Sequence, residues 1–160
     1  MFGLSKKDRV AEALRRGTAG ALTGGFLHPD QIQGFGLNRE ASSYIYSEAL
    51  THQIFALGLI YSNSQFSNEP WATSSFFNDH VSAAITEHEK SISVAPGTVN
   101  SVVFNRINEL IRLYQNGNFA HLKDSAIRVA QKDPKIDANF VFNQLKQSTE
   151  QYIVAAAKMF

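Results

Sequence analysis

Two ionisable residues, Glu48 and His52, lie four positions apart in a stretch that is otherwise rich in apolar residues. At that spacing they share one face of a helix, one turn from each other. The same face carries Ile45, Ala49 and Ala56, so the Glu48 carboxylate needs a partner to offset its burial. It could orient His52 as a general base or as a metal ligand. Glu48 and His52 are therefore the candidate catalytic residues.

A second group, His80, Glu87 and His88, falls within or beside the apolar arc of a predicted helix over residues 74–91. If this helix packed antiparallel to the helix of Glu48 and His52, the five side chains could converge. Nitrogen and carboxylate ligands of this kind bind divalent metals in helical bundles. A small metal-dependent or acid–base enzyme is therefore one alternative function.

The interpretation we favour for Glu48 is structural. Arg106 lies on the buried side of a predicted helix over residues 98–116, and a Glu48–His52 or Glu48–Arg106 network would satisfy the acid. The Glu-x-x-His pairs of di-iron bundles, the His-Glu-x-x-His motif and the Gly-x-Ser-x-Gly elbow are all missing from the sequence. We therefore expect no cofactor, and we expect His121, on a polar helix face, and Asp124, as a turn or cap residue, to have no functional role.

Aromatic residues are the second resource of the chain, with 12 Phe, 5 Tyr and one Trp. Most occupy positions at core spacing, but some apolar residues do not fit this pattern. Side chains left over once a core is filled are typical of an interface with a partner or with a second copy. The predicted interface residues are Phe66, Trp71, Phe140 and Val154, with Trp71 as the best hot-spot candidate.

The elements that must position these residues are all predicted to be helices. Asn38 is a helix-capping residue type, and the segment 38–62 that it begins is apolar on almost every side, which is typical of a buried helix. Further apolar-periodic segments are separated by breakers such as Pro96-Gly97, Gly117 and Asp133-Pro134. The sequence therefore predicts an all-α fold, a compact bundle of five to six helices around the central helix at about 38–62. The remaining predicted helices cover residues 5–17, 74–91, 98–116, 118–132 and 137–160.

The turn Gly117-Asn118-Phe119, the helix through Val129 and the terminal Asp133-Pro134 together resemble the turn and second helix of a tetratricopeptide repeat. The resemblance covers one repeat. Leu110, Leu122 and Val129 stand where that family has small residues, and no second copy follows one period away. It implies a helical hairpin at this point of the chain.

The N-terminal part combines a basic helix with a Gly-rich segment. Residues 1–16 carry a net charge of +3, residues 17–105 a net of −5, and residues 106–160 a net of +3. We expect the first helix to end near Gly17 and to dock on the acidic middle of the chain. Residues 1–36 would form a mobile or docking arm of a single helical domain spanning residues 1–160. A distant alternative is peripheral membrane association through residues 1–16.

Composition excludes several classes of function. The chain has 160 residues and no Cys, which rules out disulfides, thiolate catalysis and Cys-ligated metal sites. The basic residues are too dispersed for a nucleic-acid surface. Neither a membrane-spanning run nor a signal peptide is recognisable, so the expected location is cytoplasmic.

Taken together, the missing catalytic motifs, the leftover aromatics and the segregated charge favour a non-enzymatic helical protein. We expect it to act by binding another protein or by self-association, as an inhibitor, a chaperone or a regulatory subunit does.

Overall fold

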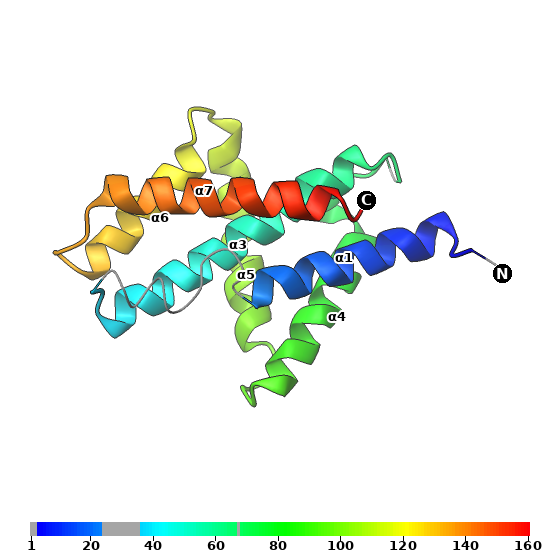
Figure 1. Cartoon of the computed structure of the whole chain (residues 1–160), viewed down its shortest axis with the longest axis horizontal. Coiled ribbons are helices and arrows are strands. Elements are labelled where there is room, and N and C mark those ends of the chain that lie inside the picture. The colour runs from blue at the N-terminus through cyan, green and yellow to red at the C-terminus, as the bar shows by residue number, and fades with distance from the viewer. Residues whose placement is uncertain (1–2, 24–35, 67) are drawn as a thin grey trace.

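The computed structural model describes residues 3–23, 36–66 and 68–160. This part of the chain is all-helical and contains no strand, as the sequence predicts. Six α-helices and one short 3₁₀ helix follow in the order α1 (Lys6–Leu22), α3 (Arg39–Asn63), η1 (Trp71–Thr73), α4 (Ser75–Ser91), α5 (Thr98–Gln115), α6 (Ala120–Lys132) and α7 (Ala138–Ala157). Figure 1 shows α1, α3 and α7 running along the length of the molecule, with α4 and α5 lying across them.

Side-chain caps fix the start of most helices. Ser5, Asn38, Ser74 and Asp137 each accept a hydrogen bond from a backbone N–H in the first turn of α1, α3, α4 and α7. Such caps satisfy donors that have no partner inside the helix. Helix α6 differs from the prediction, because Asn118 does not cap it with its side chain. Its N-cap is Phe119, in the left-handed region at φ 57°.

The first helix is longer than predicted. It continues through Gly17 and Gly20 to Leu22, so the expectation that it ends near Gly17 is wrong. Gly17 is used for close packing instead: a Cβ there would lie 2.7 Å from Leu57 Cδ1. Its carbonyl also accepts a 2.8 Å hydrogen bond from the Tyr152 hydroxyl. The absent side chain thus lets α1 approach α3 and α7. Of the predicted arm at residues 1–36, residues 1–2 and 24–35 lie outside the described residues.

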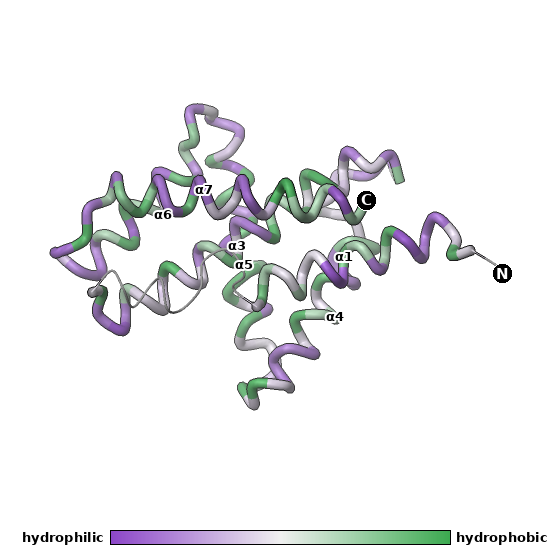
Figure 2. The backbone as a smooth tube through the Cα atoms, in the orientation of Figure 1, coloured by the Kyte–Doolittle hydropathy of each residue, from purple (hydrophilic) through white to green (hydrophobic). Residues whose placement is uncertain are grey.

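Two hydrophobic clusters adjoin along α3. The larger one draws on α1, the second half of α3, η1, α4, α5 and the end of α7. The smaller one joins Ile45 and Ala49, in the first half of α3, to α6 and the start of α7. In the hydropathy colouring of Figure 2, the first turn of α1 is hydrophilic and the last turns of α7 are mainly hydrophobic.

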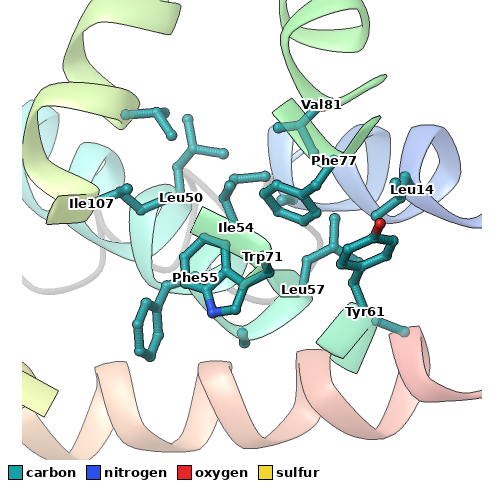
Figure 3. Close-up of a cluster of buried hydrophobic side chains, with 14 of the residues drawn as sticks. Leu14, Leu50, Ile54, Phe55, Leu57, Tyr61, Trp71, Phe77, Val81 and Ile107 are labelled. Carbon is teal, nitrogen blue, oxygen red and sulfur yellow. The ribbon is translucent and has the colours of Figure 1, made fainter. Parts of the chain in front are cut away.

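Trp71 belongs to the larger cluster. Only 8% of its surface is exposed, and its ring packs edge-on against Phe55 and Phe77 at centroid distances of 5.6 and 5.3 Å. Figure 3 shows the indole among Phe55, Phe77 and Leu57 in the interior. The prediction that Trp71 is left over for a partner is therefore wrong. The short helix η1 carries the ring back onto α3 from a segment that the sequence marks only as a break.

The apolar spacing of α5 and α7 predicts an inward face for each helix, with Val102 and Tyr114 on that of α5 and Ile153 on that of α7. These predicted faces are partly wrong. Val103, Ile107 and Leu110 are buried as expected, but Val102 is 45% exposed and Tyr114 46% exposed. On α7, Ile153 is 37% exposed although its spacing predicts burial. These helices pack with a narrower stripe than the sequence pattern indicates, which leaves apolar side chains at the surface.

Candidate functional site

Glu48 is sealed in an ionic network between α3, α5 and α6. The Nε of Arg106 lies 3.1 Å from Glu48 Oε1, and Nη2 of the same guanidinium lies 2.6 Å from Asp124 Oδ2. Arg106 is also paired with Glu109 at 2.6 Å. The Glu48–Arg106 pair is one of the two predicted structural networks. A carboxylate already neutralised in this way is a poor general base.

The network extends to the surface through Arg128, which pairs with Glu109 at 2.6 Å and with Asp124 at 2.9 Å. Asp124 is thus neither a cap nor a turn residue, contrary to the prediction. Although burial opposes the charge of Arg106, the hydrogen bond of Asp124 and the nearby charge of Glu48 raise the pKa of its guanidinium. Arg106 therefore stays charged throughout the accessible pH range and holds three carboxylates together.

His52 contacts the network through Ser125. Its Nε2 lies 2.8 Å from Ser125 Oγ, and the same hydroxyl donates to a carboxylate oxygen of Glu48. Because the single hydroxyl proton is engaged with Glu48, Nε2 of His52 must carry a proton and donate to Ser125. This leaves Nδ1 of His52 as a bare acceptor. Burial, followed by the nearby His121 and Arg106, lowers the pKa of His52 to about 3.

The Ser125–His52–Glu48 arrangement has the residue types of a hydrolase triad but not its geometry. In a triad the acid binds the imidazole and the imidazole binds the serine hydroxyl as its base. Here the acid binds the serine, the imidazole donates to it, and Ser125 is completely buried. No substrate carbonyl can reach that hydroxyl, so the arrangement does not support acyl transfer.

The second predicted group of ligands lies elsewhere. His80 on α4 packs edge-on against Phe76 at 4.6 Å, and burial together with the charge of Arg15 lowers its pKa. Glu87 and His88 line a groove between α1 and α4 with Arg15 and Arg16. Across residues 3–23, 36–66 and 68–160, no three His, Asp or Glu side chains gather closely enough to hold a metal ion. The structure therefore does not bring His80, Glu87 and His88 together with Glu48 and His52.

A pocket in the described part of the chain opens beside His52. It has a volume of about 680 Å³ and lies between α3, the turn that joins α5 to α6, and α7. This volume falls within the usual range for small-ligand sites. Its walls are mainly apolar and aromatic, and they include Phe55, Leu59, Tyr114, Phe119, Leu122 and Ile153.

His121 forms part of the same pocket wall. The residue is only 8% exposed, and its ring lies 5.5 Å from that of His52 and 5.1 Å from that of Tyr114. Burial lowers the pKa of His121, so both rings are neutral at pH 7. The Nδ1 atoms of both histidines are buried without a hydrogen-bond partner. Unpaired buried polar atoms are uncommon in proteins and are expected to have an explanation.

The rim of the pocket is built on an unusual turn. Gly117, Asn118 and Phe119 follow one another at φ values of 72°, 52° and 57°, and this left-handed conformation is rare for a bulky residue such as Phe. The turn holds the Phe119 ring half-exposed, with Lys146 Nζ 4.8 Å from its centroid. Lys146 and Glu150 of α7 form the polar part of the rim, 3.9 Å apart. Strain of this kind is concentrated at functional sites.

Sequence reasoning missed two residues of this region. Ser125 lies three residues after Leu122 and four before Val129, so it falls on the buried stripe of α6, where a polar residue needs a partner. His121 directly precedes Leu122 and lies four residues before Ser125, so it falls on the same buried stripe, and the prediction of a polar face for it is wrong. The predicted interface residues Phe140 and Val154 are 40% and 61% exposed. Phe66 is partly buried against Phe76, at 4.8 Å.

The chain matches no family model, no curated protein and no solved structure.

Proposed function

We propose that this is a non-enzymatic helical protein that acts by binding another protein, and that the partner docks around the pocket between α3, the α5–α6 turn and α7. The observation that carries the proposal is the gathering of Tyr114, Phe119 and Ile153, each between a third and a half exposed, around one apolar pocket. Exposed apolar side chains next to a concave site are typical of interfaces.

The fate of the ionisable residues supports a binding role over a catalytic one. Arg106 pairs with Glu48, Asp124 and Glu109, so its charge and that of the buried Glu48 are already engaged within the fold. Among the residues that line the pocket, the carboxylate is Glu150, which pairs with Lys146 at the rim, and there is no serine. The pocket wall contributes two neutral imidazoles instead, those of His52 and His121. Neutral imidazoles suit the recognition of a partner.

The proposal takes α3 as the central helix of the bundle. It is supported by the complete burial of Ile45, Ile54 and Leu57, which point to different sides of this helix. A rigid central helix would hold His52 and Phe55 fixed at the base of the pocket, so that the partner meets a preformed site. Preformed sites bind with a smaller loss of conformational entropy.

Site-specific photo-cross-linking tests the proposal. We would place p-benzoylphenylalanine at Phe119, 48% exposed at the rim, and at Ile127, 53% exposed on α6 and not part of the pocket wall. In the cells that produce the protein, we expect position 119 to cross-link one protein species and position 127 to leave it uncaptured. The identified species, once purified, should give the same cross-link with the purified chain.

Competition provides the control. An excess of the unlabelled wild-type chain should abolish the cross-link, whereas an excess of the Phe119→Ala/Ile153→Ala double variant should leave it in place. Equal cross-linking from both positions would contradict the proposal. A product consisting of two copies of this chain would contradict it as well, because that outcome shows self-association instead of binding to another protein.

A further inference from the structure

The pocket has one chemical preference that its apolar walls alone do not explain. His52 and His121 both line the pocket, and the Nδ1 atom of each ring is buried without a hydrogen-bond partner. His52 is completely buried and His121 is 92% buried, from an exposed fraction of 8%. A buried polar nitrogen with no partner costs about 1–3 kcal/mol. A ligand that brings a donor to Nδ1 of His52, or to Nδ1 of a His121 ring with its proton on Nε2, removes this cost.

The protonation states define which ligand group can pair with them. Nε2 of His52 must donate to Ser125, because the Ser125 proton is engaged with Glu48, so Nδ1 of His52 can only accept. A carboxylate or phosphate, which only accepts, would face this lone pair unfavourably. Nδ1 of His52 therefore favours a ligand group that carries an N–H or an O–H.

The surrounding walls define the body of that group. Phe55 and His121 each pack edge to face with Tyr114, at centroid distances of 5.2 and 5.1 Å, and their own two rings are tilted to each other at 5.8 Å. Such an arrangement offers ring faces and edges on which a further aromatic ring can pack. Phe119 and Ile153 extend the apolar surface to the rim, where Lys146 and Glu150 meet solvent.

We propose that the pocket receives a tryptophan or tyrosine side chain of the partner protein, whose indole N–H or phenol O–H is accepted by Nδ1 of His52 or His121. The inference rests on the proposed function and names the anchor by which the partner would bind. Side chains of these two types combine a large apolar ring with one polar atom and dominate binding energy at interfaces. Since both Nδ1 atoms are covered in this structure, the ring of His121 or of half-exposed Tyr114 must move aside as the anchor enters.

Matched ring compounds test the inference on the full chain by NMR titration. Indole and 1-methylindole have nearly the same shape, but only indole carries the donor. We expect indole to shift the backbone amides of Phe119 and Ile153, and 1-methylindole to bind about tenfold more weakly, the equivalent of about 1.4 kcal/mol for one hydrogen bond. N-acetyltryptophanamide, which presents the ring as a protein does, should bind at least as well as indole.

Two variants locate the acceptor. His121→Phe and His52→Phe keep an aromatic ring and remove the nitrogen, and we expect the preference for indole over 1-methylindole to vanish in one of them. If His52→Phe does not fold, long-range ¹H–¹⁵N spectra of the wild-type imidazoles replace it. The Nδ1 resonance of His52 or His121 should then move toward the hydrogen-bonded value on addition of indole and stay in place with 1-methylindole.

Three results would overturn the inference. Equal binding of indole and 1-methylindole would remove the role of the donor, while cross-linking at Phe119 could still support the proposed function. Binding of indole without binding of N-acetyltryptophanamide would assign the pocket to a free aromatic compound. No response of the pocket amides to any of the three probes would exclude an aromatic anchor, again without affecting the cross-linking result.

Discussion

At the scale of single residues, Gly58 packs directly against the Trp71 ring. A Cβ on Gly58 would lie 2.4 Å from two atoms of the Trp71 ring, closer than non-bonded carbon atoms can approach. Gly58→Ala must therefore displace the indole from its place between Phe55 and Phe77. Overpacking of this kind costs typically about 1–3 kcal/mol, and urea denaturation should show a loss of stability in that range.

Gly20 is the matched control for Gly58, because it is also helical and a Cβ there would meet no neighbouring atom within 4 Å. Gly20→Ala removes only the backbone freedom of glycine, so it should be neutral or stabilise the fold by up to about 1 kcal/mol. Equal effects of the two substitutions would show that the Trp71 ring adapts without strain.

His52 makes the stability of the fold depend on acid. Its pKa is about 3 in the folded chain, compared with about 6.5 in an unfolded one. Between these values the unfolded chain binds the extra proton, so stability falls as the pH decreases below 6.5. For this one group the loss between pH 7 and pH 5 is about 2 kcal/mol, and the lowered pKa of His121 acts in the same direction.

Urea denaturation at pH 7, 6 and 5 measures this dependence. In His52→Gln the group no longer titrates, so near pH 5 the slope of unfolding free energy against pH should decrease by about 1.4 kcal/mol per pH unit. An unchanged slope would mean that the buried imidazole takes up its proton as readily in the folded chain as in the unfolded one.

Individual residues differ in how far the sequence can predict them. The Glu48–Arg106 pair is foreseeable, because a carboxylate and a guanidinium both fall on apolar helix faces and each needs the other. The burial of Trp71 is not, because it depends on a three-residue helix and on the space above Gly58. Helical periodicity reports which side of a helix is apolar but not which loop residue folds back onto it.

At the scale of helices, the ionic network ties α3, α5 and α6 together through Arg106. Replacing this residue with Met would leave Glu48, 4% exposed, as a buried charge without its counter-ion. Breaking a buried pair in this way costs about 3–5 kcal/mol, so Arg106→Met should lower the urea midpoint strongly. Glu48→Met in the same chain should restore part of the loss, because it removes the uncompensated charge.

The ion pair between Lys132 and Glu40 is the control for the buried network. It lies at the surface, with side chains 37% and 70% exposed and atoms 3.3 Å apart. Exposed pairs contribute about 0–1 kcal/mol because solvent screens them, so Lys132→Met should change stability little. If Lys132→Met lost much stability and Arg106→Met lost little, Lys132–Glu40 would be the strong pair and Glu48–Arg106 the weak one, contrary to this prediction.

Helix boundaries show a related limit of sequence reasoning. The caps Ser5, Asn38 and Asp137 are predictable because a polar residue just before an apolar-periodic run has a defined local role. The extension of α1 past Gly17 is not, because glycine usually ends helices and only the neighbouring Leu57 and Tyr152 show why it is needed here. Likewise, the left-handed Phe119 that forms the pocket rim has no local signature.

At the scale of the whole molecule, the placement of α1 bears on the membrane alternative. Val10 is 7% exposed and Leu14 fully buried, so the apolar face of this helix packs into the larger cluster. Within residues 3–23, 36–66 and 68–160, the helices are too short or too polar to cross a bilayer. Peripheral binding through α1 would then depend on its basic side chains alone, since insertion requires an apolar face.

Vesicle flotation tests this reasoning on the full chain. With vesicles of phosphatidylcholine and phosphatidylserine at about 0.15 M salt, we expect the protein to stay in the unbound fraction, because a few exposed cations are largely screened at that ionic strength. A Leu14→Ala variant loosens the packing of α1 and frees part of its apolar face, so it should float more than the wild type. Flotation of the wild-type chain that is lost in Lys6→Gln/Lys7→Gln/Arg9→Gln would contradict this prediction, because it would show that the exposed basic side chains of α1 bind the membrane surface although its apolar face is packed inside the fold.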